Sequence, residues 1–400
     1  MNGSAPLDAE FFASLERSIC DVNSARALPP VCYTDAEFYE FEKEAVFNHE
    51  WLCVGRESWV KSPGDFFTSM HVGEPIVIVR NREGVLKAFS TVCQHRAALV
   101  AEGQGNARAF SCPYHHWTYS LDGTLIAAPD MERACEFDMG DIALPEFRVE
   151  VWLGFVFVNF DPKAKPLTPR LEALADVLKN FELETADEPT RVEVLGQAWG
   201  QKYDWNWKVH FENSNDSYHA NKLHKGFNDI MPTSLAVFPE MPPDTAGYFR
   251  HNPTLEIDAG FNPTNRALLP IFPKLTEEER KRVLFVNIPP TFSLFARVDY
   301  ISFNIFRAEG PRSVTAARSW MVAPGATKDR NFRQLMQMTA HANPEVVKQD
   351  RYVDALVQSG LRSRYAPRGR YSWQEGGQIA LNRWLVERYR ACWASDWSPS

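Results

Sequence analysis

The spacing of hydrophobic and polar positions changes in character along the chain. Near the N-terminus apolar residues recur at helical spacing, which predicts helices over residues 7–17 and 35–51. From about residue 50 the pattern changes to short apolar runs separated by turn residues, such as 75–80 and 85–92 around a turn at 81–84. This second stretch therefore predicts a small all-β region.

After that hairpin the pattern of short strands continues, and a pattern of alternating helices and strands follows it. Further short strands are predicted at 107–112, 116–120, 124–129 and 151–160, and the sequence 161–166 is typical of a linker. After the linker, helices are predicted at 170–181, 206–219, 329–342, 344–359 and 373–390, and strands at 190–203, 282–287, 300–307 and 314–322. The predicted fold class is α+β, with helices packed on an antiparallel sheet in the C-terminal part.

The 400 residues exceed the usual size of a single hydrophobic core, so more than one domain is expected. The pattern divides them into an N-terminal helical segment (1–49), an all-β domain (50–165) and a C-terminal domain (166–400). The turn at 121–123 and the glycines at 103 and 105 lie within the middle domain. We expect functional loops there, because strand ends and turns present side chains away from the core.

Composition narrows the function classes. A net charge of −8 argues against non-specific nucleic-acid binding, which needs clustered cations. No apolar run approaches the ~20 residues that span a bilayer, so no membrane association is expected, and the acidic N-terminus lacks the pattern of a secretory signal. Seven cysteines, an odd number in a long chain, favour free thiols and a cytoplasmic location.

The first candidate site combines two mixed Cys/His pairs, Cys93 with His95 and Cys112 with His115. Thiolate and imidazole bind zinc or iron–sulfur centres, and two closely spaced pairs let two loops close one site. A Cys and a His on each loop suit a [2Fe–2S] cluster in which one iron has two Cys ligands and the other has two His. A structural zinc site, or two core cysteines with unrelated histidines, remain the alternatives.

The second candidate site lies in the segment from Trp205 to His224. His219 and His224 are five residues apart and would not share a face of one continuous helix, but a helix ending near His219 would let both converge on one metal. Asp216 lies one helical turn before His219 and could orient its imidazole. Two histidines and a further carboxylate would form a site for Fe(II) with open positions, whereas ordinary helix-end histidines are the alternative.

These motifs resemble those of a known family. The runs CQHR from Cys93 and CPYHHWTYSLDG from Cys112, followed by the spacing D-x-x-H-x-x-x-x-H from Asp216, closely resemble the Rieske non-haem iron oxygenases, in their terminal oxygenase (alpha) subunits. The segment 359–385 is more similar to the branch acting on choline-, betaine- or carnitine-type compounds than to naphthalene-type dioxygenases. The resemblance implies a Rieske [2Fe–2S] domain followed by a helix-grip-like catalytic domain with one mononuclear Fe(II).

The resemblance also implies the third iron ligand. The segment 348–361 is similar to the family's ligand-bearing helix, and Asp350 is the expected ligand, with Asp354 as the alternative. Gln349 departs from the pattern, because family members often have an acidic residue there. Asn213 is expected near the iron, as part of the upstream Glu212-Asn213 pair.

A role in electron transfer is implied for Asp216. In the family the short route between the two metal centres crosses to the neighbouring subunit of a ring-shaped homotrimer. Asp216 would then connect His219 of its own subunit with His115 of the next subunit. By the same resemblance Trp117 would pack beside the cluster, and His210 is expected to be structural.

The implied activity is that of a terminal oxygenase. Electrons would come from NAD(P)H through a flavin/iron–sulfur reductase, directly or through a ferredoxin, and O₂ would be the co-substrate. The substrate would be a small N-methyl, quaternary ammonium or aromatic compound, hydroxylated or demethylated in an apolar pocket lined from 227–235 and 285–306. The alternatives are a subunit of an aromatic-ring cis-dihydroxylating dioxygenase and, without enzymatic activity, a Rieske-type electron carrier.

Overall fold

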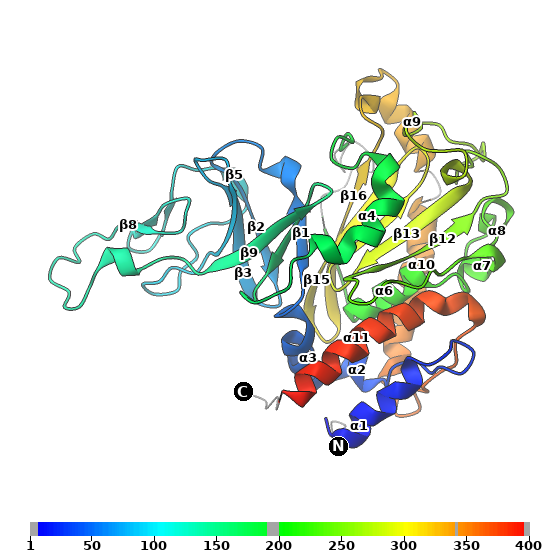
Figure 1. Cartoon of the computed structure of the whole chain (residues 1–400), viewed down its shortest axis with the longest axis horizontal. Helices are drawn as coiled ribbons and strands as arrows, with labels where there is room; N and C mark the ends of the chain where they lie inside the picture. The colour runs from blue at the N-terminus through cyan, green and yellow to red at the C-terminus, as the bar shows by residue number, and fades with distance from the viewer. Residues whose placement is uncertain (1–6, 190–199, 341–342, 396–400) are drawn as a thin grey trace. The chain divides into compact units, whose positions relative to one another are not determined.

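The computed structural model describes residues 7–189, 200–340 and 343–395 (Figure 1). The chain divides into two compact units, one of Phe47–Thr168 and one that combines Met1–Val46 with Pro169–Ser400. The N-terminal helices α1 (Ala9–Ser14), α2 (Val31–Thr34) and α3 (Ala36–Glu42) therefore belong to the same unit as the C-terminal part of the chain.

The Phe47–Thr168 unit is built from antiparallel strands, as predicted. Its larger sheet has the order β1-β10-β9-β4-β3-β2-β5, and a second sheet has the order β6-β7-β8. The strands are β1 (Leu52–Arg56), β2 (Asp65–His71), β3 (Glu74–Arg80), β4 (Leu86–Ser90), β5 (Gln104–Asn106), β6 (Phe110–Ser111), β7 (Thr118–Tyr119), β8 (Leu125–Ala127), β9 (Glu146–Trp152) and β10 (Phe155–Asn159).

One strand prediction in this unit is wrong. Residues 151–160 were expected to form a single strand, but β9 ends at Trp152 and β10 begins at Phe155, and the two pair as a hairpin. Leu153 and Gly154 form the turn with φ of 48° and 76°. Positive φ at both central positions is the backbone of the tight hairpin turn whose twist matches that of the strands. The apolar run hid this turn, because only Gly154 signals it.

The second unit contains the other sheet, in the order β11-β16-β15-β14-β13-β12 and antiparallel throughout. Its strands are β11 (Gln201–Tyr203), β12 (Tyr248–Pro253), β13 (Arg282–Ile288), β14 (Phe292–Ala296), β15 (Ile301–Gly310) and β16 (Ser313–Met321). The predictions for β13, β15 and β16 are confirmed, whereas β12 and β14 were not predicted. Of the strand predicted at 190–203, residues 190–199 lie outside the described residues.

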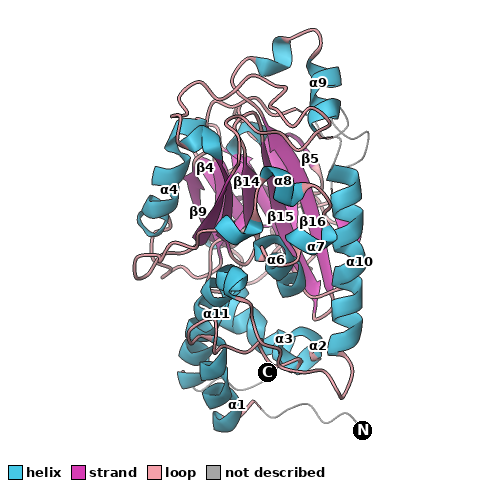
Figure 2. Cartoon of the chain, turned by 90° about the vertical axis from the view of Figure 1, so that its right-hand side faces the viewer, coloured by secondary structure: helices cyan, strands magenta, loops and turns pink. Residues whose placement is uncertain are grey.

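Helices cover this sheet, which confirms the predicted α+β class. The described α-helices that follow the Phe47–Thr168 unit are α4 (Glu172–Leu178), α6 (Trp207–Asn215), α7 (Ala220–Leu223), α8 (Phe227–Ile230), α9 (Phe332–Thr339), α10 (Asn343–Leu361) and α11 (Gly376–Ala394). In Figure 2, α6, α7 and α8 lie over one face of the sheet and α10 runs beside them. Among the described helices, none is both long and apolar enough to cross a membrane.

A buried ion pair fixes α6 within this unit. The Lys208 ammonium lies 2.6 Å from a carboxylate oxygen of Glu42 on α3, and both side chains are fully buried. The indole of Trp207 donates a hydrogen bond to the same carboxylate, and the Tyr389 hydroxyl of α11 is a further partner. Because a buried charge is costly without its partners, these contacts hold three distant segments of the chain together.

Side-chain amides tie the same helix to the sheet and to α10. Asn215 donates to the Tyr248 hydroxyl of β12 and accepts from the Asn287 amide of β13. At the other end of α6, the backbone N–H of Asn206 donates to Gln358 of α10 over 2.7 Å. These buried bonds set the position of the helix whose C-terminal end leads into the histidine segment.

Candidate metal centres

The four residues of the predicted cluster lie on two loops of the Phe47–Thr168 unit. Cys93 and His95 lie in the loop after β4, and Cys112 and His115 lie between β6 and β7. Both cysteine side chains are 2% exposed and belong to a hydrophobic core. The structure therefore brings the two predicted pairs to the same core.

The two loops have the same backbone conformation. In each loop the cysteine carbonyl accepts a hydrogen bond from the N–H four residues on, and the cysteine N–H donates to the carbonyl five residues on. The four bonds are Ala97 N to Cys93 O (3.0 Å), Cys93 N to Ala98 O (2.9 Å), His116 N to Cys112 O (3.0 Å) and Cys112 N to Trp117 O (2.8 Å). Ala97 and His116 both have φ of +57°, unusual for non-glycine residues. Two matching turns thus present two Cys/His pairs.

The histidines of the two loops face each other. The imidazole rings of His95 and His115 lie 4.6 Å apart in an edge-to-face arrangement, and the indole of Trp117 stacks on His95 at 4.7 Å. The Nδ1 atom of His115 is buried and has no hydrogen-bond partner among the described residues. Two buried thiols and two adjacent imidazoles, one with an orphaned nitrogen, fit the donor set of a mixed-ligand [2Fe–2S] cluster.

One residue of this site, Tyr119, is not among the residues predicted from the sequence. Its hydroxyl lies 3.4 Å from the Sγ of Cys93 and accepts a hydrogen bond from the backbone N–H of Gln94. Burial acts to raise the pKa of the Cys93 thiol, but the Tyr119 hydroxyl and the backbone N–H of His95 outweigh it, so the pKa lies below its ordinary value. The site thus favours a thiolate, the form that binds metal.

The second predicted site lies at the C-terminal end of α6 and on α10. The helix carrying Asn206 was expected to continue to His219, but α6 ends at Asn215. His219 and His224 are instead the residues that precede and follow the single turn of α7, and their rings lie 5.2 Å apart. Convergence of the two histidines therefore comes from a short helix between them, because Asp216 is extended and interrupts the longer one.

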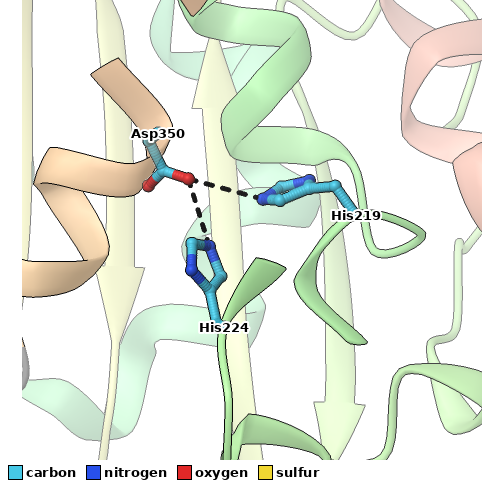
Figure 3. Close-up of side chains that lie close together, drawn as sticks. All are labelled: His219, His224 and Asp350. Carbon is cyan, nitrogen blue, oxygen red and sulfur yellow. Dashed lines mark ion pairs between the residues drawn. The ribbon is translucent and has the colours of Figure 1, made fainter. Parts of the chain in front are cut away.

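Asp350 of α10 completes the group, as Figure 3 shows. Its Oδ1 atom lies 3.1 Å from His224 Nε2 and 3.6 Å from His219 Nε2. The same oxygen is buried and has no hydrogen-bond partner among the described residues. An oxygen and two nitrogens that point at one place without hydrogen bonds fit a shared metal ion, and two histidines with one carboxylate are a typical ligand set for non-haem Fe(II).

Asp354, the alternative third ligand, lies elsewhere. Its Oδ2 is 3.8 Å from Nδ1 of His210, and it does not belong to the group around His219. Burial, followed by the nearby charge of Asp350, raises the pKa of Asp354 to about 8. The geometry therefore favours Asp350 over Asp354 as the metal ligand.

The charge around His219 also suits a cation. Burial alone would lower the pKa of this histidine, but the carboxylates of Asp216 and Asp350 outweigh burial and raise the pKa to about 9. A group with such a pKa holds a proton at neutral pH. A metal ion at this place would meet the same two negative charges.

Each histidine has a second partner on the side away from Asp350. An oxygen of Asp216 lies 3.0 Å from His219 Nδ1, and the Gln349 carbonyl oxygen lies 2.9 Å from His224 Nδ1. Because a glutamine carbonyl only accepts hydrogen bonds, His224 donates from Nδ1 and leaves Nε2 free to bind a metal. Gln349, which departs from the pattern described above, is thus a hydrogen-bond partner of the candidate ligand His224.

The other sequence candidates differ in where their side chains lie. Asn213 lines the cavity beside the group and contacts Asp354. Glu212 does not line that cavity: its carboxylate accepts a hydrogen bond from the Tyr33 hydroxyl of α2, and burial raises its pKa to about 7. His210, expected to be structural, lies in the cavity wall.

The cavity next to the histidines has a volume of about 400 Å³. Its floor is the sheet, where side chains lie in rows because paired positions on neighbouring strands face the same way. One row is Asn287, Ser293, Asn304 and Arg318, and the next is Arg250, Phe285, Phe295, Ser302 and Trp320. The predicted segments 227–235 and 285–306 line the cavity in part, the first through Phe227, Met231 and Thr233, but the polar row was not anticipated.

Two family profiles match the chain. Residues 50–148 match "Rieske [2Fe-2S] domain", and residues 181–391 match "Ring hydroxylating alpha subunit (catalytic domain)". The first match contains both Cys/His loops. The second contains His219, His224 and Asp350 and covers just over half of the chain.

Several characterised proteins are similar in sequence. The carnitine monooxygenase oxygenase subunit of Acinetobacter pittii is 35% identical over 206 residues, which are 51% of this chain and 54% of that protein. The chain thus spans about half the length of this relative. The chloroplastic choline monooxygenase of Arabidopsis thaliana is 28% identical over 366 residues, which are 86% of this chain and 78% of that protein.

Solved structures share the fold. A quaternary ammonium Rieske monooxygenase in complex with L-carnitine has a TM-score of 0.74 at 23% identity, covering 96% of this chain and 99% of that chain. Naphthalene 1,2-dioxygenase from a Rhodococcus species has a TM-score of 0.76 at 18% identity with the same coverage. At such identities the likeness concerns the fold alone.

Proposed function

The chain belongs to the ring-hydroxylating alpha subunit family, and we propose that it is the terminal oxygenase component of a multicomponent Rieske oxygenase. It takes electrons from a reductase and uses O₂ to hydroxylate or oxidatively demethylate a small organic substrate. The observation that carries this proposal is the buried, unpartnered Oδ1 of Asp350, aimed at the Nε2 atoms of His219 and His224 beside a cavity.

When bound, a mixed-ligand cluster supplies single electrons, and a ferrous ion held by two histidines and one carboxylate leaves positions open for O₂. The residues of this chain have supporting tasks. Gln349 accepts a hydrogen bond from His224 Nδ1, and the Asp216 carboxylate lies at ion-pair distance from His219 Nδ1. These contacts favour imidazole orientations in which both Nε2 atoms are directed at one point. The adjoining cavity of about 400 Å³ leaves room for a small organic substrate beside them.

The ligand assignments are part of the proposal. Cys93, His95, Cys112 and His115 hold the [2Fe–2S] cluster, and His219, His224 and Asp350 hold the mononuclear iron. Two matching loops support the first set, and the converging donor atoms support the second. Asn213 lies at the edge of the iron site and contributes to the cavity wall.

The substrate proposal follows the relatives and the cavity together. The relatives named above act on carnitine and on choline, which favours a small N-methyl or quaternary ammonium compound. An aromatic hydrocarbon, the substrate type of a ring-dihydroxylating dioxygenase, is less suited, because it has no hydrogen-bonding group to place against the polar side chains of Asn287, Ser293 and Asn304 on the cavity floor.

The partners and assembly complete the proposal. NAD(P)H acts through a flavin/iron–sulfur reductase, with or without a ferredoxin, and the subunits form a homotrimer. One solved relative is described as having inter-subunit electron transfer, and Asp216 would make that connection here between His219 and His115 of the neighbouring subunit. The cysteine content supports a cytoplasmic location.

Oxygen consumption tests the function. Purified protein would be mixed with NADH and a surrogate reductase, and compounds from the N-methyl, quaternary amine and aromatic acid classes would be screened with mass detection of products. We expect substrate-dependent O₂ uptake and a product that has gained oxygen or lost a methyl group. A cluster that is reduced normally, without O₂ uptake for any class, would instead support the electron-carrier alternative.

A further inference from the structure

A chain of buried hydrogen bonds links the end of α6 to the cavity floor. Asn215, the last residue of α6, donates from Nδ2 to the Phe211 carbonyl oxygen over 2.8 Å and to the Tyr248 hydroxyl over 3.0 Å. The Nδ2 atom of Asn287 on β13 donates in turn to Asn215 Oδ1 over 2.6 Å. The side chains of Asn215, Tyr248 and Asn287 belong to residues that are 1%, 4% and 2% exposed. The chain therefore holds Asn287 from one side.

The direction of each amide follows from this chain. A backbone carbonyl oxygen only accepts hydrogen bonds, so the atom of Asn215 that faces Phe211 must be the nitrogen. The other end of the Asn215 amide is then its oxygen, and the atom of Asn287 that faces this oxygen must be a nitrogen. A turned amide would bring two like groups together at one of the contacts. The Oδ1 atom of Asn287 is thus the end of the side chain that remains for another partner.

That oxygen is an unpaired acceptor at the cavity. Asn287 lines the cavity, and its Oδ1 atom is buried without a hydrogen bond to any described residue. Because Asn215 of α6 takes up the amide nitrogen, the oxygen is the end of Asn287 that is left for the cavity. A buried acceptor without a donor is costly, so this position favours a bound group that donates a hydrogen bond.

The neighbouring hydroxyls on the sheet do not supply the donor. Ser293 lies directly opposite Asn287 on β14, and its hydroxyl oxygen accepts from the Asn304 amide over 3.1 Å. Tyr248 lies opposite Asn287 on β12, and its hydroxyl accepts from Asn215. Within the described ranges of the chain, neither hydroxyl is a partner of the Asn287 oxygen. The donor therefore comes from a molecule in the cavity.

The same chain connects this acceptor to the histidine centre. Asp216 directly follows Asn215, and an oxygen of its carboxylate lies 3.0 Å from His219 Nδ1. Asn287, Asp216 and His219 all line the one cavity of about 400 Å³. A small molecule that donates to Asn287 thus lies in the cavity that the candidate iron ligands share.

We propose that Asn287 is a specificity-determining residue, whose Oδ1 atom accepts a hydrogen bond from an O–H or N–H group of the substrate. This inference rests on the proposed function and narrows its substrate class to compounds that carry such a donor. A fully methylated ammonium compound without a hydroxyl has no donor for this oxygen. The inference therefore divides the N-methyl compounds into those that pair with Asn287 and those that leave its oxygen unpaired.

Ligand pairs that differ by one donor test the proposal by binding, without turnover. Choline and its methyl ether, N,N-dimethylglycine and glycine betaine, and benzyl alcohol and benzyl methyl ether would be titrated calorimetrically into the iron-loaded protein under anaerobic conditions. We expect the donor-bearing member of at least one pair to bind about 3- to 10-fold more tightly than its methylated partner, the factor that one hydrogen bond gives.

Two variants separate a specific role from the added bulk of a methyl group. Asn287→Leu removes the acceptor with little change in side-chain size and should bring the ratio within each pair close to one. Asn180→Leu makes the same chemical change at an amide that donates to Glu279 and is not among the described residues that line the cavity, so it should keep the wild-type ratio. Circular dichroism would confirm that each variant is folded. If Asn287→Leu does not fold, the wild-type ratios decide.

The proposal is overturned if no donor-bearing ligand binds the wild type more tightly than its methylated partner. It is also overturned if Asn287→Leu, while folded, keeps the wild-type ratio, or if Asn180→Leu loses the ratio to the same extent. A donor preference without any O₂ uptake would support the role of Asn287 and contradict the oxygenase function. O₂ uptake with donor-free compounds, without a donor preference, would do the reverse.

Discussion

The two candidate metal centres are assembled in different ways. The cluster residues lie within Cys93–His115, on two turns whose backbone hydrogen bonds repeat each other. The second centre joins His219 and His224, on either side of α7, with Asp350 of α10, and thus depends on segments far apart in the chain. Local backbone geometry defines the first centre, whereas side-chain contacts between packed elements define the second.

This difference predicts which substitutions should disrupt each centre. Each cluster loop is held by its own N–H and carbonyl groups, so a distant side-chain change should leave it intact. The histidine centre depends on Asp216 and Gln349, on the amides that fix α6, and on the buried pair of Lys208 and Glu42. Variants of these supporting residues should therefore affect the second centre and spare the first.

The largest effect is expected for Asp216→Asn. The amide keeps the shape of the side chain but loses the charge that faces His219 Nδ1, and with it the proposed connection to the neighbouring subunit. Both metals should stay bound while product formation falls by a factor on the order of 100 or more. Rapid-freeze measurement of electron transfer from the reduced cluster, together with product yield, checks this.

A matched control is available on α8. Asp229→Asn makes the same chemical change at an exposed position and should keep full activity. Turnover of Asp216→Asn at the wild-type rate would show that the charge has no such role. Loss of iron from Asp216→Asn would assign the residue to metal binding instead.

A smaller effect is expected for Gln349→Leu. Leucine removes the acceptor that faces His224 Nδ1, so the imidazole loses its fixed orientation, and affinity for a divalent metal should fall about 10- to 100-fold. Calorimetric titration with Co²⁺ of protein that holds the cluster but lacks the mononuclear iron measures this affinity. The red-brown cluster should be unaffected.

Gln349→Glu sharpens the same test, because a carboxylate also accepts from Nδ1 and should restore metal binding. If Gln349→Leu binds Co²⁺ as the wild type does, the contact with His224 has no function in the site. If Gln349→Leu also loses the cluster, a change at the histidine centre affects the cluster site, and the two centres are not independent of each other.

The sequence predicts the local features of this molecule well. The four cluster residues are adjacent to turn signals, and β13, β15 and β16 contain the β-branched and aromatic residues that favour strands. The identity of Tyr119 as a thiol partner could not be read from spacing, since an aromatic residue in a short strand is usually only a core residue. Its position on β7, which follows the loop of Cys112, is the one signal that could have indicated the contact.

Features that depend on distant contacts escaped prediction. The end of α6 at Asn215 could not be seen, because the helical spacing of the apolar residues gives no sign that Asp216 is extended. β14 was not predicted, because it is a strand of only five residues after the Pro289-Pro290 turn, and such a short run does not distinguish a strand from a loop. The polar row from Ser293 to Arg318 becomes visible only when strand register places its members opposite one another.

One chain is proposed to carry two separate iron sites. The most direct test is the iron content and the electron paramagnetic resonance spectrum of anaerobically reconstituted protein, compared with a His219→Ala/His224→Ala variant. The account predicts about three iron atoms per chain in the wild type and about two in the variant, with an unchanged mixed-ligand cluster signal after reduction. Two iron atoms per chain in both proteins, or no cluster signal in the wild type, would contradict it.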